Sequence, residues 1–449
     1  MSKYQTYPEY KDSGIDWLKE MPSHWHLRKA KHIFQRVQRP IRETDGVVTA
    51  FRDGQVTLRS NRRTDGFTNS LKEIGYQGVR VNDLLVHAMD GFAGAIGISD
   101  SDGKCSPVCS VCVPWNKENT NMPYYGYLVR QLAVTDFISS LAKGIRERST
   151  EFRFSEFSGL LLAYPPVEEQ TQIAAFLDHE TAKIDTLIEK QQKLIELLKE
   201  KRQAVISHAV TKGLNPDATM KDSGVEWLGE VPEHWGVVQA KYIADITRGA
   251  ILRPVDDPRY FSDKGDWAYL NISDATKCDK YLYDSKLKLS PLGSTKSARV
   301  YPDNVIITAS ATIGKAFINK IKVCVHDGFI PFCNSKLDIN YLYHYLSNPY
   351  LYAAMGKSNT QKNIYLDEVK NMAVTFPPQE EQEAIVLYLE SIADKYVQLI
   401  KEAETAITLM QERRTALISA AVTGKIDVRN WVAPATSSDT NEVQQEVTA

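Results

Sequence analysis

Three cysteines, Cys105, Cys109 and Cys112, lie close together in the segment CSPVCSVC. Thiolates at short spacing can bind zinc, which in structural sites takes four ligands. A fourth ligand is missing from this segment, and its apolar alternation is typical of a β-strand. We therefore expect no metal site here.

The sequence contains none of the common motifs of nucleotide, dinucleotide or zinc-protease chemistry: GxxxxGK[ST], GxGxxG and HExxH are absent. An intact Asn/Asp-Pro-Pro-aromatic tetrapeptide, which amino-methyltransferases use, is also missing, and Asn348-Pro349-Tyr350 is better explained as a turn. His24 and His234 each precede a tryptophan, and we expect them to pack rather than to catalyse. The chain is therefore predicted to bind and organise other molecules, without a catalytic residue, cofactor or metal of its own.

Residues suited to reading DNA gather in two regions. Positions 35 to 63 contain seven arginines and three acidic residues, which gives this segment a net charge of +4. Arginine makes forked contacts with guanine edges and phosphates, although a solvated charged face is the alternative explanation. In the first region we predict that DNA is faced by Arg52, Arg59, Arg62, Arg63, His87 and Asp90. In the second region the predicted residues are Arg248, Arg253, Ser273, Asp274, Thr276, Ser310, Thr312 and Lys315.

These two regions lie in a duplicated frame. Residues 11–25 (KDSGIDWLKEMPSHW) and 221–235 (KDSGVEWLGEVPEHW) are identical at ten of fifteen positions, and we call them the tryptophan motifs. PPVEEQ at 165–170 returns as PPQEEQ at 377–382, at nearly the same offset. The chain is therefore a tandem duplication, in which conserved ends enclose two variable regions.

A segment with helical periodicity follows each double proline. Apolar residues recur with 4,3 spacing from Ile173 to Val205 and from Ile385 to Leu417, which is typical of a coiled coil. An amphipathic helix on a globular core is the alternative. At 1.5 Å per residue each helix would extend roughly 65–70 Å, and the two seams can meet if the helices are antiparallel.

The fold predicted from these patterns is mixed α/β (α+β), with alternating strand-like segments such as residues 46–63 in the variable regions. Two sheet-rich heads are separated by two long antiparallel coiled-coil helices, with internal pseudo-two-fold symmetry. The predicted boundaries are a first head at 1–164, a helix at 165–213, a second head at 214–376, a helix at 377–426 and a disordered tail at 427–449.

Composition narrows the classes of protein further. Lys and Arg total 54 and Asp and Glu total 56, which excludes a histone-like polycation but permits a DNA-binding protein with one basic face. No stretch approaches the ~18 apolar residues of a membrane helix, and the N-terminus has no signal-like region. We expect a cytoplasmic protein, in which six cysteines do not form a disulfide framework.

The paired KDSG..WL.E.P.HW motifs, the PP.EEQ helix starts and the divergent heads resemble the specificity subunits of type I restriction-modification systems. The resemblance covers residues 10–430. It implies two target recognition domains, each reading half of a bipartite, asymmetric site in double-stranded DNA. It also implies partners: two methyltransferase (modification) subunits that bring S-adenosylmethionine, and restriction subunits that use ATP and Mg to translocate and cleave phage DNA.

Two other classes of function stay open on the sequence alone. A self-contained methyltransferase-nuclease chain would itself modify DNA when supplied with labelled S-adenosylmethionine. A structural coiled-coil adaptor would show no sequence preference in a gel shift on varied duplexes.

Overall fold

The computed structural model describes residues 4–62, 74–135, 137–140, 152–250, 257–310, 312–353, 355 and 363–433. The chain folds into two compact units: unit 1 contains residues 1–191 and 405–449, and unit 2 contains residues 192–404. Each unit therefore holds one head and part of each long helix. The units cut across the sequential boundaries predicted above.

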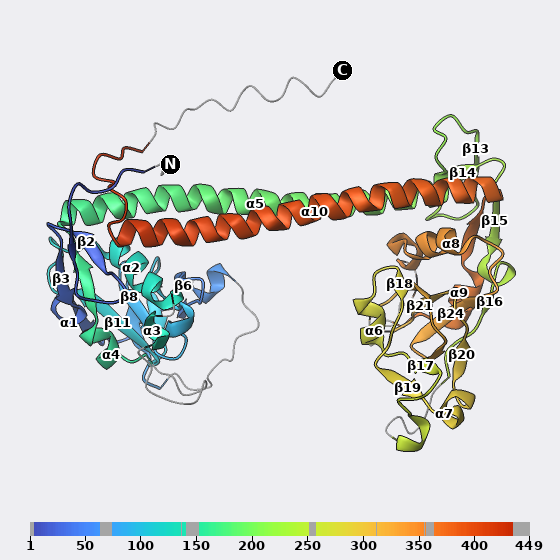
Figure 1. Cartoon of the computed structure of the whole chain (residues 1–449), viewed down its shortest axis with the longest axis horizontal. Coiled ribbons are helices and arrows are strands. Elements are labelled where there is room, and N and C mark those ends of the chain that lie inside the picture. Colours follow the sequence, from blue (N-terminus) through green and yellow to red (C-terminus); the bar gives the residue numbers. More distant parts are fainter. Residues whose placement is uncertain are drawn as a thin grey trace. The chain divides into compact units, whose positions relative to one another are not determined.

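The two long helices are α5 (Val167–Lys212) and α10 (Gln379–Val422), as Figure 1 shows. Each carries two glutamates in its first turn, where carboxylates favour the positive end of the helix dipole. Each is followed by a glycine with positive φ, Gly213 at 77° and Gly424 at 72°, a conformation that glycine adopts at low cost. The prediction of two long helices is confirmed.

Within each unit the two helix segments run antiparallel. In unit 1, Asp185 of α5 pairs with Arg414 of α10 at 2.9 Å, and the start of α5 shares a hydrophobic core with the end of α10. In unit 2, Val210 near the end of α5 shares a core with Ile385 near the start of α10. The same pairing is therefore built twice, once in each unit.

The packed face of α5 departs from the predicted 4,3 seam. In unit 1 the predicted seam positions Ile173, Leu177 and Ile184 are buried, but the packed face then continues through Ile188. The predicted seam positions Leu187 and Leu194 are instead 50% and 43% exposed. A straight helix has 3.6 residues per turn, so its contact face drifts by about 20° per heptad from a strict 3.5-residue repeat. The seam prediction was wrong at these positions for that reason.

Head 1 contains a four-stranded antiparallel sheet and a second layer of paired strands. The sheet has the order β4-β11-β8-β9, with β4 at Phe34–Val37, β11 at Cys109–Pro114, β8 at Leu84–His87 and β9 at Ile96–Ile98. The second layer pairs β10 (Gly103–Cys105) with β7 (Gln77–Val79), and β5 (Val48–Ala50) with β6 (Val56–Leu58). A single parallel bridge, Val47 to Lys104, links these two pairs.

Head 2 repeats this topology and adds a fifth strand, β18, which pairs in parallel with β22. Its larger sheet has the order β16-β24-β21-β22-β18, with β16 at Asp245–Ile246, β24 at Phe329–Cys333, β21 at Asn304–Thr308, β22 at Ala316–Asn319 and β18 at Tyr281–Leu282. The second sheet has the order β19-β17-β23-β20, with β19 at Leu287–Leu289, β17 at Trp267–Tyr269, β23 at Val323–Val325 and β20 at Ala298–Val300. The two heads are therefore the same fold on divergent sequences, which sequence comparison within the chain showed only as scattered matches.

Short hairpins and helices complete each unit. Unit 1 has β1 (Tyr10–Asp12), β2 (Glu20–Pro22), β3 (His26–Lys29), β12 (Leu161–Tyr164), α1 (Ala30–Ile33), α2 (Met122–Val134), α3 (Phe137–Ser140) and α4 (Phe154–Gly159). Unit 2 has β13 (Met220–Asp222), β14 (Glu230–Pro232), β15 (Gly236–Gln239), β25 (Ala373–Phe376), α6 (Ile272–Lys277), α7 (Pro291–Thr295), α8 (Ile339–Leu346) and α9 (Leu366–Asn371). The pairs β3–β12 and β15–β25 bring the two ends of each head together.

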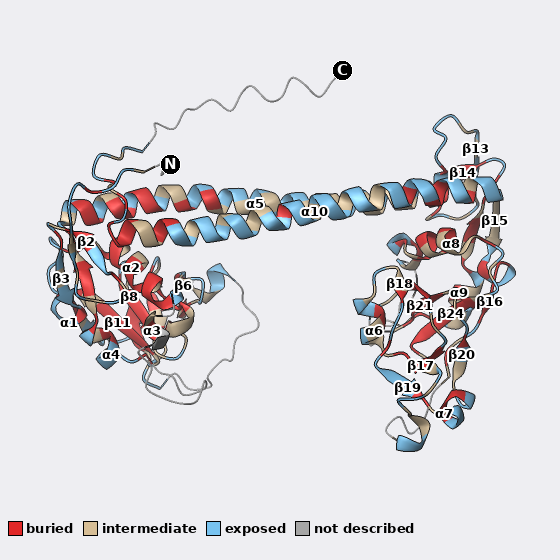
Figure 2. Ribbon diagram, in the orientation of Figure 1, coloured by how far each residue is buried: buried red, intermediate tan, exposed pale blue. Residues whose placement is uncertain are grey.

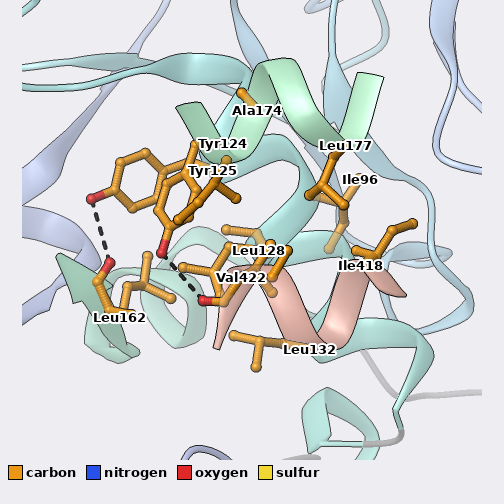
Figure 3. Close-up of a cluster of buried hydrophobic side chains, with 14 of the residues drawn as sticks. Ile96, Tyr124, Tyr125, Leu128, Leu132, Leu162, Ala174, Leu177, Ile418 and Val422 are labelled. Carbon is orange, nitrogen blue, oxygen red and sulfur yellow. Dashed lines mark hydrogen bonds between the residues drawn. The ribbon is translucent and has the colours of Figure 1, made fainter. Parts of the chain in front are cut away.

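The core of unit 1 lies where α2 packs between its sheet and the two long helices. Figure 3 shows Tyr124 and Leu128 of α2 among residues of α5 and α10. The Tyr124 hydroxyl donates to the Val422 carbonyl oxygen at 3.3 Å. In unit 2 the Tyr341 hydroxyl of α8 donates likewise to the carbonyl oxygen of Val210, at 3.0 Å. The two long helices, α5 and α10, are most buried near the heads (Figure 2).

In unit 1 the second glutamate of the PP.EEQ segment joins the tryptophan motif to α5. Glu169 Oε1 lies 2.6 Å from His24 Nε2, and its Oε2 accepts hydrogen bonds from Trp25 Nε1 at 2.9 Å and the Tyr7 hydroxyl at 3.0 Å. The predicted packing role of His24 is therefore carried out through a hydrogen bond to a carboxylate.

This contact between the tryptophan motif and the start of a long helix, which we call the joint, is also present in unit 2. Glu381 Oε1 lies 2.5 Å from His234 Nε2, and its Oε2 accepts from Trp235 Nε1 at 3.0 Å. The conserved frame of the sequence is thus a pair of equivalent joints between head and helix.

Residues 427–433, predicted as the start of a disordered tail, pack onto unit 1. Val428 belongs to its core, and the Trp431 ring lies 5.5 Å from the Phe176 ring. The rest of that predicted tail lies outside the described residues. No helix in the described ranges has both the length and the apolar character needed to cross a membrane.

Candidate nucleic-acid interface

In head 1 the structure brings three predicted residues together. Arg52, in the turn between β5 and β6, donates from Nη2 to Asp90 Oδ1 at 2.7 Å, and Asp90 follows β8. The backbone N–H of Asp90 donates to His87 Nδ1 at 2.9 Å. Gly94 lets the two loops approach, because a Cβ there would lie 2.6 Å from the Arg52 carbonyl oxygen. The loop after β8 and the β5–β6 turn thus form one polar surface.

Burial and hydrogen bonding both favour the neutral form of the His87 ring in this surface. Burial lowers its pKa below the ordinary value, and the nearby Asp90 carboxylate opposes that shift. Because Nδ1 accepts the Asp90 N–H, the hydrogen-bond pattern assigns the ring proton to Nε2. His87 is therefore suited to donate one hydrogen bond rather than to supply a positive charge.

The other predicted arginines of head 1 flank the turn. Arg62 pairs with Asp53 at 2.7 Å and stacks over the Phe51 ring at 4.3 Å. Arg59 Nε donates to the Thr49 hydroxyl at 2.9 Å. Arg63 lies outside the described residues.

Part of the basic cluster stabilises the head itself. Arg39 donates two hydrogen bonds to the Asp83 carboxylate, one of them at 3.1 Å, and Arg42 pairs with Asp102 at 3.1 Å. The local charge of +4 therefore overstates the number of arginines that can meet a phosphate or a base.

In head 2 the predicted residues Ser310, Thr312 and Lys315 lie in the loop between β21 and β22. This loop corresponds to the one that holds Asp90, because Thr308 and His87 both end their strands opposite the first residue of the neighbouring strand. The Lys315 N–H donates to the Thr308 hydroxyl at 3.1 Å, and its Nζ donates to the carbonyl oxygen of Asp279 at 3.1 Å.

Helix α6 occupies the connection from β17 to β19, where head 1 has the turn that carries Arg52. Ser273 and Thr276 are exposed on it. Asp274 instead accepts the Asn271 N–H at 3.0 Å and the Ser285 hydroxyl at 3.2 Å. Asp274 therefore caps the helix.

Arg248 lies beside a histidine that the sequence reasoning missed. Its Nε donates to the Asp327 carbonyl oxygen at 2.9 Å, and the neighbouring His326 accepts the Gly328 N–H on Nδ1 at 2.9 Å. Burial lowers the pKa of His326. The segment Val-His-Asp-Gly, similar in type to the segment after Val86 in head 1, is the signal that could have found it. Arg253 lies outside the described residues.

The three clustered cysteines belong to the core of head 1. Cys105, Cys109 and Cys112 are buried on β10 and β11, and burial raises the pKa of the Cys112 thiol to about 12. Across the described part of the chain, no three His, Cys, Asp or Glu side chains are arranged to hold a metal ion.

The sequence matches known specificity subunits along most of its length. A family model described as type I restriction modification DNA specificity domain matches residues 232–409. The putative type I restriction enzyme MjaX specificity subunit of Methanocaldococcus jannaschii is 26% identical over 70% of each chain. The MjaVIII specificity subunit of that organism is 25% identical over 82% of this chain and 84% of its own, and the EcoBI specificity subunit of Escherichia coli is 24% identical over 77% and 73%.

Solved structures show the same fold. A chain from a study of complex assembly and conformational transition of the type I R-M system has a TM-score of 0.69 at 17% identity, covering 90% of this chain and 99% of its own. The HsdS subunit of Thermoanaerobacter tengcongensis has a TM-score of 0.51 at 17% identity, covering 90% and 98%.

These matches define a DNA-recognition protein built from two heads and two long helices. The chain is similar to the specificity subunits of type I restriction-modification systems along most of its length. In such a system it is the non-catalytic subunit that recognises the DNA sequence.

Proposed function

We propose that this subunit reads a bipartite, asymmetric site in cytoplasmic double-stranded DNA, one half-site with each head. The observation that carries the proposal is that two heads of one topology present different side chains on equivalent loops. Head 1 offers Arg52, His87 and Asp90, whereas head 2 offers Ser310 and Lys315 in the corresponding loop. Direct readout depends on such donors and acceptors at base edges, so different loops would read different half-sites.

We further propose that the long helices recruit two methyltransferase subunits, which supply S-adenosylmethionine, and that restriction subunits supply ATP- and Mg-dependent cleavage. Large apolar side chains stay exposed on both helices, among them Leu187 in unit 1 and Leu387 in unit 2. Exposed apolar side chains of this size can contribute to a protein interface. The proposal thus assigns chemistry to the partners and recognition to this chain.

Mapping methylated adenines by single-molecule sequencing tests the proposal. Cells would express the modification subunits with the natural chain, with Arg52→Ala combined with Asp90→Ala, or with Ser310→Ala combined with Lys315→Ala. Each double variant should relax one half-site and leave the other intact, at about 1–3 kcal/mol per lost base contact. Removing both members of the Arg52–Asp90 pair avoids leaving one charge without its partner.

Arg36→Ala provides a matched control, because Arg36 is exposed on β4 of the same head and is not among the predicted contacts. Unchanged methylation in both double variants would show that these loops do not read the DNA.

A further inference from the structure

A cleft of about 620 Å³ opens in unit 1 among head 1, α2 and the long helices. Its walls come from the β5–β6 turn, β9, α2, α5 and α10. One side is apolar and includes Ile96, Ile98, Ile188 and Ile418; Figure 3 shows Ile96 and Ile418. The volume falls in the range of small-molecule sites.

Two consecutive residues of α2 that also line the cleft carry unpaired donors. Arg130 Nε and Gln131 Nε2 are buried and have no hydrogen-bond partner among the described residues. Gln131 is only 5% exposed. Burying an unpaired donor is destabilising, and most buried polar groups in proteins are paired. Two such donors in one wall point to an acceptor that the protein itself does not supply.

One cation of the cleft forms no ion pair among the described residues. Asp53, Asp178 and Asp185 each contact an arginine or tyrosine side chain at 2.7–2.9 Å. Arg414 is the partner of Asp185, whereas Arg130 forms no ion pair within the described ranges. Burial is the main cause that lowers the pKa of Arg130, and the positive charge of Arg414 adds to it, whereas Asp53, Tyr127 and Asp185 oppose the shift. An anion between the two guanidinium groups would remove this repulsion.

Unit 2 carries a comparable group at the corresponding junction. Arg202, which corresponds to Arg414 in the repeat, and Gln203 both leave buried side-chain donors unpaired. His344 of α8 also has a buried ring nitrogen without a partner there. Burial, Lys280 and Arg202 together lower the pKa of His344 to about 3. Buried side-chain nitrogens without a hydrogen-bond partner among the described residues are therefore found at the head–helix junction of both copies.

We propose that the cleft of unit 1 binds a small molecule that carries one oxyanion, either a carboxylate or a phosphate, on an apolar body. Arg130 and Gln131 provide N–H donors for the oxyanion, and the isoleucine side provides apolar contact. A guanidinium binds either oxyanion through charge-assisted hydrogen bonds, which are stronger than neutral ones. None of the lining residues is among the predicted DNA contacts, although Arg52 and the lining residue Asp53 share the β5–β6 turn, and the inference does not depend on those contacts.

Calorimetric titration of the full chain tests this inference with four probes. Phenyl phosphate and benzoate combine an oxyanion with an apolar body, whereas inorganic phosphate lacks the body and phenol lacks the charge. We expect the first two to bind, phosphate to bind more weakly and phenol to show no saturable binding. Arg130→Met should weaken phenyl phosphate binding at least tenfold, and Arg36→Met, on exposed β4, should leave it unchanged.

The fold of the Arg130→Met variant is checked separately by its melting temperature without ligand. We expect no decrease, because the substitution removes a buried charge that forms no ion pair among the described residues. Equal binding by this variant and the natural chain, or no binding of either oxyanion probe, would overturn the inference and leave water as the content of the cleft. If Arg130→Met instead weakened only binding of a duplex of unrelated sequence, the occupant would be a DNA phosphate, and the small-molecule inference would also be wrong.

Discussion

The carboxylate of Glu169 collects hydrogen bonds from His24, Trp25 and Tyr7 at the joint of unit 1. Glu169→Ala would leave these donors without their acceptor, and we expect the free energy of unfolding to fall by about 2–4 kcal/mol. Glu381→Ala should cost less, because the Glu381 side chain is 39% exposed against 10% for Glu169.

Thermal or urea unfolding of the full chain measures this difference. Glu168→Ala is the matched control, since Glu168 is the exposed neighbour in the same helical turn. If Glu169→Ala and Glu168→Ala lowered stability equally, the joint would not depend on the carboxylate.

His344 predicts a pH dependence in unit 2. Its pKa is lowered to about 3, first by burial and then by Lys280 and Arg202, whereas an unfolded histidine titrates near 6.5. The unfolded state therefore takes up the proton first. The contribution of this neutral ring to the free energy of unfolding is fully present above about pH 6.5. It decreases as the pH falls toward 3, by up to ~1.4 kcal/mol per pH unit.

Melting temperatures at pH 7 and pH 5 check the sign. His344→Leu should lose less stability than the natural chain over this interval, whereas His208→Leu, at an exposed position of α5, should lose the same amount as the natural chain. A loss in His344→Leu as large as that of the natural chain would contradict the assignment.

At the scale of single residues, the sequence showed where arginines cluster but did not show which carboxylates they pair with. The cluster of arginines was visible, but whether an arginine meets solvent depends on carboxylates far away in the chain. The Arg39 side chain pairs with the Asp83 carboxylate, and Arg42 pairs with Asp102. Such pairings follow from the topology of the head, which residue spacing alone does not specify.

The ends of the two long helices depend on glycine. Gly424 has φ +72°, and a Cβ on it would lie 2.5 Å from Cδ of Pro22. Gly14 has nearly the same φ, +71°, and a Cβ on it would have no neighbour within 4 Å. Gly14→Ala should therefore show backbone strain alone, about 1–2 kcal/mol, whereas Gly424→Ala should add a steric cost of about 1–3 kcal/mol.

Denaturation of the two variants side by side measures the steric part as their difference. Equal losses would mean that the chain end shifts to accept the new Cβ. The comparison also tests whether the tryptophan motif is rigidly docked on the end of α10, since Pro22 belongs to that motif.

Helices were easier to predict than sheets because their periodicity is local. The double prolines, glutamates and glycines marked both long helices closely, while the drift of the contact face past Leu187 was missed because a fixed 3.5-residue spacing was assumed. The shared topology of the heads was not predictable in the same way. Buried strands such as Leu84–His87 and Asn304–Thr308 need only apolar residues, so their equivalence rests on pairing between distant segments.

Two joints and two heads of one topology make the chain modular. Exchanging residues 36–160 with 246–372 leaves both tryptophan motifs and both long helices in place. Tyr124 and Tyr341 would exchange their acceptors, the carbonyl oxygens of Val422 and Val210, which lie at corresponding positions of the helices. Each swapped head could therefore donate its tyrosine hydroxyl to an equivalent backbone carbonyl oxygen.

The side-chain contacts of each head are also transferable. The Tyr127 hydroxyl donates to Asp178 at 2.8 Å in unit 1, and Lys280 pairs with Glu390 at 2.6 Å in unit 2. Asp178 and Glu390 correspond in the repeat, so each head would again meet a carboxylate. Asn348, which follows α8 and donates to Ser207 at 3.0 Å, would meet another serine.

We therefore expect the swapped chain to fold, to recruit the modification subunits and to direct methylation to the two original half-sites in exchanged positions. The physical reason is that each head carries its own loops, while the frame offers the same acceptors at both joints. Mapping methylated adenines in cells that express the swapped chain gives the answer, and co-purification of the modification subunits verifies assembly. An assembled chain that methylates an unrelated sequence would show that a head owes its specificity to its place in the frame rather than to its own loop residues.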